Sequence, residues 1–204
     1  MAEKQLTARG AATRQRIVDA AADEFSAHGI AGARVERIVA AARTNKAQLY
    51  GYFGSKEGLF DAVFRASLER ILDVVPIEAS DLPGWAVRLY DEYLRRPDLI
   101  RLATWARLER RPTGHLVDDA DRLDGRKLRF IADAQANGTV VPGDPFDIMA
   151  LVIGMSMAWS PVSNVYAASS DEPVAIHEAR RELLRTCVAR AVVIDAAVQH
   201  PSGA

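Results

Sequence analysis

Apolar residues recur every three or four positions along almost the whole chain. This spacing places them on one face of a helix, which has roughly 3.6 residues per turn. We find no convincing run in which apolar and polar residues alternate over the length that a half-buried strand needs. The sequence therefore predicts an all-α fold.

Composition limits the class of protein further. The chain has 204 residues, of which 49% are hydrophobic and 26% are charged, as in ordinary globular proteins. A single cysteine, Cys187, cannot form an intrachain disulfide, and residues 1–12 lack the apolar core of a secretion signal. No apolar run is long enough to span a bilayer. We expect a soluble, cytoplasmic protein that does not contact membranes.

The first 60 residues are expected to form short helices separated by tight turns. Thr13 is the expected N-cap of a first helix that ends at His28 and Gly29. Two short helices are expected over residues 35–42 and 45–53, and a fourth is expected to begin after the cap residue Ser55. The apolar side of that fourth helix is expected to contain Leu59, Phe60, Val63 and Phe64.

A proline-rich interruption at residues 76–83 precedes a larger helical body. Five further helices are expected at about residues 85–95, 98–110, 116–136, from Pro145, and 172–198. Residues 146–159 are almost all apolar, so this helix is expected to be buried on every side or packed against a partner. The interruption at residues 76–83 is the expected hinge between the first section and this body.

Charge is divided unevenly along the sequence. Residues 1–56 contain nine Lys and Arg against five Asp and Glu, whereas the remainder contains 17 against 22. A basic section followed by a mildly acidic body is typical of a protein whose first section meets a polyanion.

Residues 32–60 have the pattern of a helix-turn-helix followed by a capped helix. Leu49 and Phe53 are expected to dock the second helix of the motif, because they lie four positions apart. Asn45, Lys46 and Gln48, with part of the Tyr50 to Tyr52 edge, then stay free to enter a DNA major groove, where Asn, Gln and Lys side chains can pair with base edges. Ser55 and Lys56 lie at the start of the next helix, whose free N–H groups favour a phosphate.

The segment from Asn45 to Phe60, NKAQLYGYFGSKEGLF, resembles the signature of the TetR family of transcriptional regulators. The segment from Thr13 to Gly29 is similar to the first helix of that family. The sequence departs from the family pattern at Ala33, where a capping Thr is usual, and at Arg43, where a turn glycine is usual. A positive φ angle at Arg43 would strain the backbone.

The resemblance implies a ligand-responsive repressor that binds a palindromic operator as a homodimer through its last two helices. An unidentified small molecule would be the effector. The resemblance also implies two domains, a helix-turn-helix DNA-binding domain at 1–59 and a helical effector-binding and dimerisation domain at 60–204. Family positions that meet DNA match Arg34, Asn45, Lys46, Gln48, Tyr50, Tyr52 and Lys56. We assign Lys46 and Gln48 mainly to bases, and Tyr50, Tyr52 and Lys56 to phosphates; Thr13, Arg14 and Arg16 are weaker candidates for backbone contacts.

Six large side chains in the body are candidates for an effector site, although they can equally fill a core. They are Trp85, Tyr90, Tyr93, Trp105, Met155 and Trp159, with Glu92 as a further polar anchor.

Two alternatives stay open, namely a helical adaptor and a small-molecule enzyme that lost or never had DNA binding. The enzyme lacks support, because the sequence around Ser156 has no preceding strand and no triad base. The four histidines lack the spacing of a helical metal site. We expect no catalytic residue, no metal and no cofactor.

Overall fold

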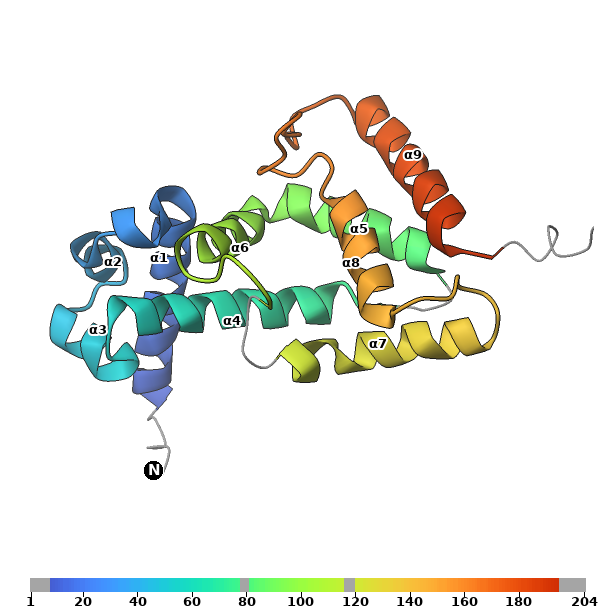
Figure 1. Cartoon of the computed structure of the whole chain (residues 1–204). Coiled ribbons are helices and arrows are strands. Elements are labelled where there is room, and N and C mark those ends of the chain that lie inside the picture. The colour runs from blue at the N-terminus through green and yellow to red at the C-terminus, as the bar shows by residue number, and fades with distance from the viewer. Residues whose placement is uncertain (1–7, 78–80, 116–119, 195–204) are drawn as a thin grey trace, which may run out of the picture. The chain divides into compact units, whose positions relative to one another are not determined.

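The structure is a computed structural model that describes residues 8–77, 81–115 and 120–194 (Figure 1). Within these ranges every regular element is a helix, and one isolated bridge pairs Val140 with Val193. The all-α prediction is confirmed. The helices are α1 (Ala8–Gly32), α2 (Val35–Ala41), α3 (Lys46–Phe53), α4 (Lys56–Val74), α5 (Leu82–Arg95), α6 (Pro97–Glu109), α7 (Ala120–Ala136), α8 (Pro145–Ser156) and α9 (Val174–Val192).

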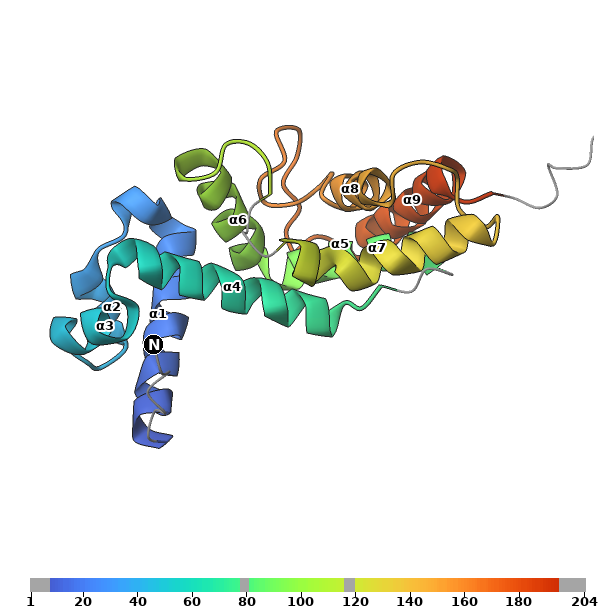
Figure 2. The same cartoon turned by 60° about the horizontal axis from the view of Figure 1, so that its bottom comes forward.

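The helices divide between two compact units (Figures 1 and 2). The first unit comprises Met1–Arg70 and Asp98–Leu116, so it holds α1 to α3, most of α4, and nearly all of α6. The second unit comprises Ile71–Pro97 and Val117–Ala204, and therefore holds α5, α7, α8 and α9. The division into a DNA-binding domain at 1–59 and an effector domain at 60–204 stays a functional prediction.

The core of the first unit contains the apolar faces that the sequence predicts. Ile17 and Phe25 of α1 are fully buried, and the Phe25 ring meets the edge of Phe60 with 5.2 Å between centroids. All four residues of the predicted apolar side of α4 are buried: Leu59, Phe60, Val63 and Phe64. Burying such side chains contributes about 1.5–3 kcal/mol each, which holds these short helices together.

In the second unit, α5 packs against both α8 and α9, and α7 packs against α8. The carboxylate of Asp81 caps α5 by accepting the N–H of Gly84 at 2.8 Å. Trp85 and Tyr90 of α5 are fully buried, with 1% of each side chain exposed. Among the helices of the described ranges, none is long and apolar enough to cross a membrane.

Two expectations about α1 have different outcomes. The prediction of Thr13 as N-cap is wrong, because α1 already includes Ala8 and Thr13 lies inside the helix. Its hydroxyl donates to the carbonyl of Arg9 at 3.0 Å, a bond that threonine can make in a helix interior. The predicted break at Gly29 is confirmed, since this residue has φ 71°.

The last two helices differ in part from expectation. Helix α8 is not buried on every side, because Leu151 is 55% exposed; packing against a partner stays a prediction. Helix α9 ends at Val192 rather than near 198, and residues 195–204 lie outside the described part. The bridge ends the helix, because the N–H of Ile194 turns to the carbonyl of Thr139 at 3.0 Å.

Candidate nucleic-acid interface

Helix α3 is docked by one fully buried side chain, Leu49. The side chain of Asn45 caps the helix by accepting the N–H of Gln48 at 2.9 Å, so the helix begins at Lys46. Lys46 and Gln48 are exposed, and 43% of Tyr50 is exposed. The sequence-based prediction of a helix with a buried apolar side and a free polar side is confirmed, although Phe53 is only half-buried.

The turn between α2 and α3 contains the positive φ angle anticipated at Arg43. This residue has φ 52°, and it is the non-glycine residue with positive φ among those described. A left-handed conformation costs an L-residue about 1–2 kcal/mol. The N–H of Thr44 closes the turn on the carbonyl of Val39 at 3.0 Å. Arg43 is exposed, and it precedes the start of α3 by three residues.

A carboxylate from α1 replaces the hydroxyl cap that α2 lacks at Ala33. Glu24 accepts the N–H of Arg34 at 2.8 Å, and both its oxygens accept from the Arg37 guanidinium. Partial burial alone would raise the pKa of Glu24, but these hydrogen bonds outweigh it and lower the pKa. The start of α2 is thereby tied to α1, while the Arg34 side chain stays exposed.

The Lys46 ammonium is paired with the carboxylate of Glu36 on α2. This hydrogen bond raises the pKa of Lys46 and lowers the pKa of Glu36. Both side chains are largely exposed, with 53% and 66% of their surfaces open to solvent. Lys46 is therefore fully charged and close to an acidic group on the same face of the unit.

Lys56 lies at the start of α4, where Ser55 accepts the N–H of Gly58 at 3.0 Å and confirms the predicted cap. The ammonium of Lys56 lies 3.3 Å from the carbonyl oxygens of both Ala31 and Ala33. An ammonium has three N–H donors, so one stays available for a phosphate.

The sequence-predicted DNA-contact residues gather on the first unit. Tyr52 and Lys56 are half-buried, and the exposed members are Arg34, Asn45, Lys46, Gln48 and Tyr50. Two weaker candidates have intramolecular partners. The Arg14 guanidinium lies 5.2 Å from the centre of the Phe53 ring, and Arg16 donates to the carbonyl of Ala42 at 3.2 Å.

The six effector candidates are divided between the two units. The Trp85 indole donates to the carbonyl of Val75 at 3.3 Å. The Tyr90 hydroxyl lies 2.7 Å from Nδ1 of His177, and Trp159 packs between the Tyr90 ring and the Arg180 guanidinium. Burial raises the pKa of Tyr93 to about 12. Trp85, Tyr90 and Tyr93 are core side chains of the second unit, and Trp159 is half-buried against them.

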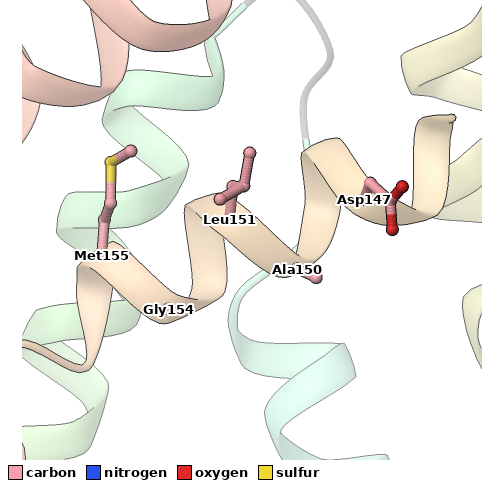
Figure 3. Close-up of a pocket in the computed structure, with 5 residues that line it drawn as sticks. All are labelled: Asp147, Ala150, Leu151, Gly154 and Met155. Atoms are coloured by element: carbon pink, nitrogen blue, oxygen red, sulfur yellow. The ribbon is translucent and has the colours of Figure 1, made fainter. Parts of the chain in front are cut away.

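The remaining two effector candidates lie elsewhere. Trp105 belongs to the first unit, where its ring packs against Gly29. Met155 lines an open hollow on the outer face of α8 together with Asp147, Ala150, Leu151 and Gly154 (Figure 3).

Three acidic residues that organise the interface were missed in the sequence. Glu24 and Glu36 act on α2 and Lys46, as described above, and Glu109 contacts the bend after α1. Glu24 and Glu36 contact residues 10 to 13 positions away, and Glu109 contacts residues 78 and 79 positions away, so helical spacing gives no signal for these contacts. Only the missing cap at Ala33 indicates that another acceptor is needed near Arg34.

Two family descriptions match the chain. Residues 17–63 match "Bacterial regulatory proteins, tetR family", and residues 81–190 match "Tetracyclin repressor-like, C-terminal domain". The first match contains the interface described above. The second covers more than half of the chain and contains α5, α7, α8 and most of α9.

Individual relatives agree with these matches. The HTH-type transcriptional repressor SCO4008 of Streptomyces coelicolor is 38% identical over 148 residues, which cover 71% of this chain and 77% of that protein. The HTH-type transcriptional regulator RutR of Escherichia coli K12 is 31% identical over 153 residues, covering 69% and 70%. The crystal structure of SCO4942 from Streptomyces coelicolor has 38% identity and a TM-score of 0.71, and the match covers 88% of this chain and 98% of that one.

A polar helix docked by a buried leucine within a helical unit, followed by a second helical unit, defines a helix-turn-helix transcriptional regulator. The relatives match across both units. The chain belongs to the TetR family, and its function is to bind DNA as a regulator of transcription.

Proposed function

We propose that this regulator is a ligand-responsive repressor that binds a near-palindromic operator as a homodimer. The exposed face of α3 carries this proposal, because its residue types suit base edges and its buried side is already satisfied by Leu49. Repression, rather than activation, is the function named for SCO4008. Because its target is bacterial DNA, the protein would act in the cytoplasm.

The DNA contacts divide by chemistry. Lys46 and Gln48 lie in the first turn of α3 and would read base edges in the major groove. Tyr50, Tyr52 and Lys56 would contact phosphates. Lys56 would use the ammonium N–H that does not point to the carbonyls of Ala31 and Ala33. Arg34 and Asn45 would contact the flanking backbone, which fixes the position of the helix but carries no sequence information.

A second copy of the chain would cover the outer face of α8. This face is apolar over Ala150, Leu151, Gly154 and Met155, and Figure 3 shows Leu151 and Met155 pointing to the same side of the helix. Helix α9 offers a matching stripe, because Ile176 and Leu183 are 43% and 54% exposed. Exposed Cys187 continues that stripe. Four helices, two from each copy, would bury these residues together.

A two-fold symmetric dimer predicts the form of the operator. The two α3 helices would enter major grooves about 34–36 Å apart, or a multiple of that distance, so the half-sites would be inverted repeats. If each copy neutralises about three to five phosphates, the logarithm of affinity would fall with the logarithm of salt with a slope of about −5 to −9.

An organic effector would weaken or strengthen this binding. The structure of AibR, which has 18% identity to this chain and a TM-score of 0.61, is titled as a complex with isovaleryl coenzyme A and operator DNA. A similar coupling between a ligand and DNA here would amount to about 1–3 kcal/mol, or roughly 5- to 150-fold in operator affinity. The family match supports binding rather than catalysis, so we assign no enzymatic activity.

Selection of genomic fragments by the purified protein tests the proposed function. Substitution of Gln48 tests whether α3 is the helix that contacts the bases, which we call the reading helix. Gln48→Ala should cost about 1–3 kcal/mol of operator binding and relax specificity at one base pair in each half-site. Tyr50→Phe should lower the affinity for all DNA sequences to a similar extent, because Tyr50 is assigned to a phosphate. A protein of native helicity that retains no genomic fragment at modest salt would contradict DNA binding itself.

Glu36→Gln should increase affinity for DNA, most of all for DNA without an operator. Removing the carboxylate leaves the charge of Lys46 uncompensated at the DNA surface, so the salt dependence should steepen by about 0.9 per subunit. Stability should change by less than about 0.5 kcal/mol, because the pair is exposed. Fluorescence anisotropy over a salt series measures both affinities.

The matched test of this interpretation is the double variant. In a Lys46→Ala background, Glu36→Gln should have a smaller effect on DNA affinity, because the pair no longer exists. An equal effect in both backgrounds would show that Glu36 acts through its own charge alone.

A further inference from the structure

The α2–α3 pair packs against α1, and the chain connects it to the rest of the first unit at an entry attachment and an exit attachment. The chain enters α2 through residues 29–33, which follow the break in α1, and it leaves α3 into the first turns of α4. Both attachments contribute to the orientation of α3, together with the contacts from α1. Glu109, the last residue of α6, contacts the entry attachment, and Arg110, which follows α6, contacts the exit attachment.

Glu109 contacts the entry attachment. One oxygen of its carboxylate accepts the N–H of Ile30 at 3.0 Å, and the other accepts the N–H of Ala31 at 2.8 Å. These are charge-assisted hydrogen bonds to N–H groups that follow the break at Gly29, and such groups otherwise lack a helical acceptor.

The backbone at Gly29 is shaped for this contact. Its φ of 71° turns the chain so that the following N–H groups face α6. A Cβ atom at this position would lie 2.6 Å from a Glu109 oxygen and 2.9 Å from the Trp105 ring. The approach of α6 therefore leaves no room for a side chain on residue 29.

Arg110 contacts the exit attachment. Its guanidinium pairs with the carboxylate of Asp61 on α4 and lies 3.4 Å from the carbonyl of Glu57. It also lies over the Phe60 ring, 5.9 Å from its centre. Two successive residues, the last of α6 and the one that follows it, thus contact the two ends of the helix-turn-helix pair.

Lys56 completes the entry attachment from the other side. Its ammonium contacts the carbonyls of Ala31 and Ala33, whereas Glu109 contacts the N–H groups of Ile30 and Ala31. The peptide groups of residues 30–33 are therefore held by an anion from α6 and a cation from α4.

We propose that Glu109 and Arg110 are positioning residues for DNA recognition, which fix the orientation of α2 and α3 through contacts with the bend at 29–33 and the start of α4. Neither residue needs to touch DNA. The proposal rests on the DNA-binding function, because it assigns to these residues the geometry of the reading helix.

Glu109→Gln and Arg110→Gln test this proposal in the full-length protein. Each should lower affinity for the selected operator about five-fold or more, since charge-assisted bonds are lost at an attachment. Affinity for DNA of unrelated sequence should change by less than two-fold after Glu109→Gln. Amide hydrogen exchange at Ile30 and Ala31 should accelerate in Glu109→Gln, while the exchange of core amides in α5 stays as in the wild type.

Asp23→Asn and Arg101→Ala are the charge-matched controls, because both residues are exposed on the same unit. Asp23→Asn should leave operator affinity within two-fold of the wild type. Operator binding by Glu109→Gln equal to that of the wild type, with native exchange at residues 30 and 31, would overturn the proposal. Equal losses on operator and unrelated DNA would also overturn it, because they indicate a charge effect. Failure of the wild type to bind its operator would instead contradict the proposed function.

Discussion

Leu151→Glu is expected to convert the protein into a monomer and to abolish tight operator binding. Leu151 is 55% exposed on the outer face of α8, where a second copy is proposed to pack. Two-fold symmetry places the new carboxylate in the interface twice, and each would lose water without gaining a partner. A monomer binds one half-site. The additional operator affinity that a dimer gains by binding two half-sites at once, about 100-fold or more, would be lost.

Light scattering and operator titration measure these two results. Val165→Glu is the matched control, because Val165 is 94% exposed but lies in the loop between α8 and α9 rather than on either helix face. It should leave both the mass and the operator affinity unchanged. A dimeric Leu151→Glu protein with native affinity would show that the copies pair through another surface.

Much of the first unit was predictable from the sequence because its signals are local. The cap at Ser55, the buried Leu49 and the break at Gly29 each depend on residues within a few positions. Local hydrogen bonds and helical spacing determine such features before any tertiary contact forms. The glycine that is usual in the family at Arg43 indicated where a positive φ could occur, and the residue has φ 52°.

The contacts that orient the reading helix were not predictable, because they join residues distant in sequence. Glu109 accepts hydrogen bonds from Ile30 and Ala31, which precede it by 79 and 78 positions. Arg110 pairs with Asp61, which precedes it by 49 positions. An exposed Glu or Arg in a helix is ordinarily a solvated side chain, so its type alone indicates nothing about a partner. Lys56 illustrates the same limit, since its motif predicts a phosphate contact but not its bonds to two carbonyls.

The apolar helices of the second unit show why burial is harder to predict than helicity. On α9 the positions Ile176, Leu183 and Cys187 repeat as the sequence indicates, yet they lie on the exposed face. The buried face consists of His177, Leu184, Val188 and Val192. A helix with two apolar stripes has one for its own core and one for another surface, and spacing alone does not distinguish them.

Gly29→Ala is expected to lower the free energy of unfolding by about 2–5 kcal/mol and to weaken operator binding. A positive φ costs alanine about 1–2 kcal/mol, and the added Cβ would clash with Glu109 and the Trp105 ring, which costs about 1–3 kcal/mol more. Thermal unfolding followed by circular dichroism should show a Tm lower by about 5 °C or more. Gly32→Ala is the matched control, since its Cβ would meet only His28 at an ordinary 3.6 Å. A Gly29→Ala protein as stable as Gly32→Ala would contradict the close approach of α6 to this bend.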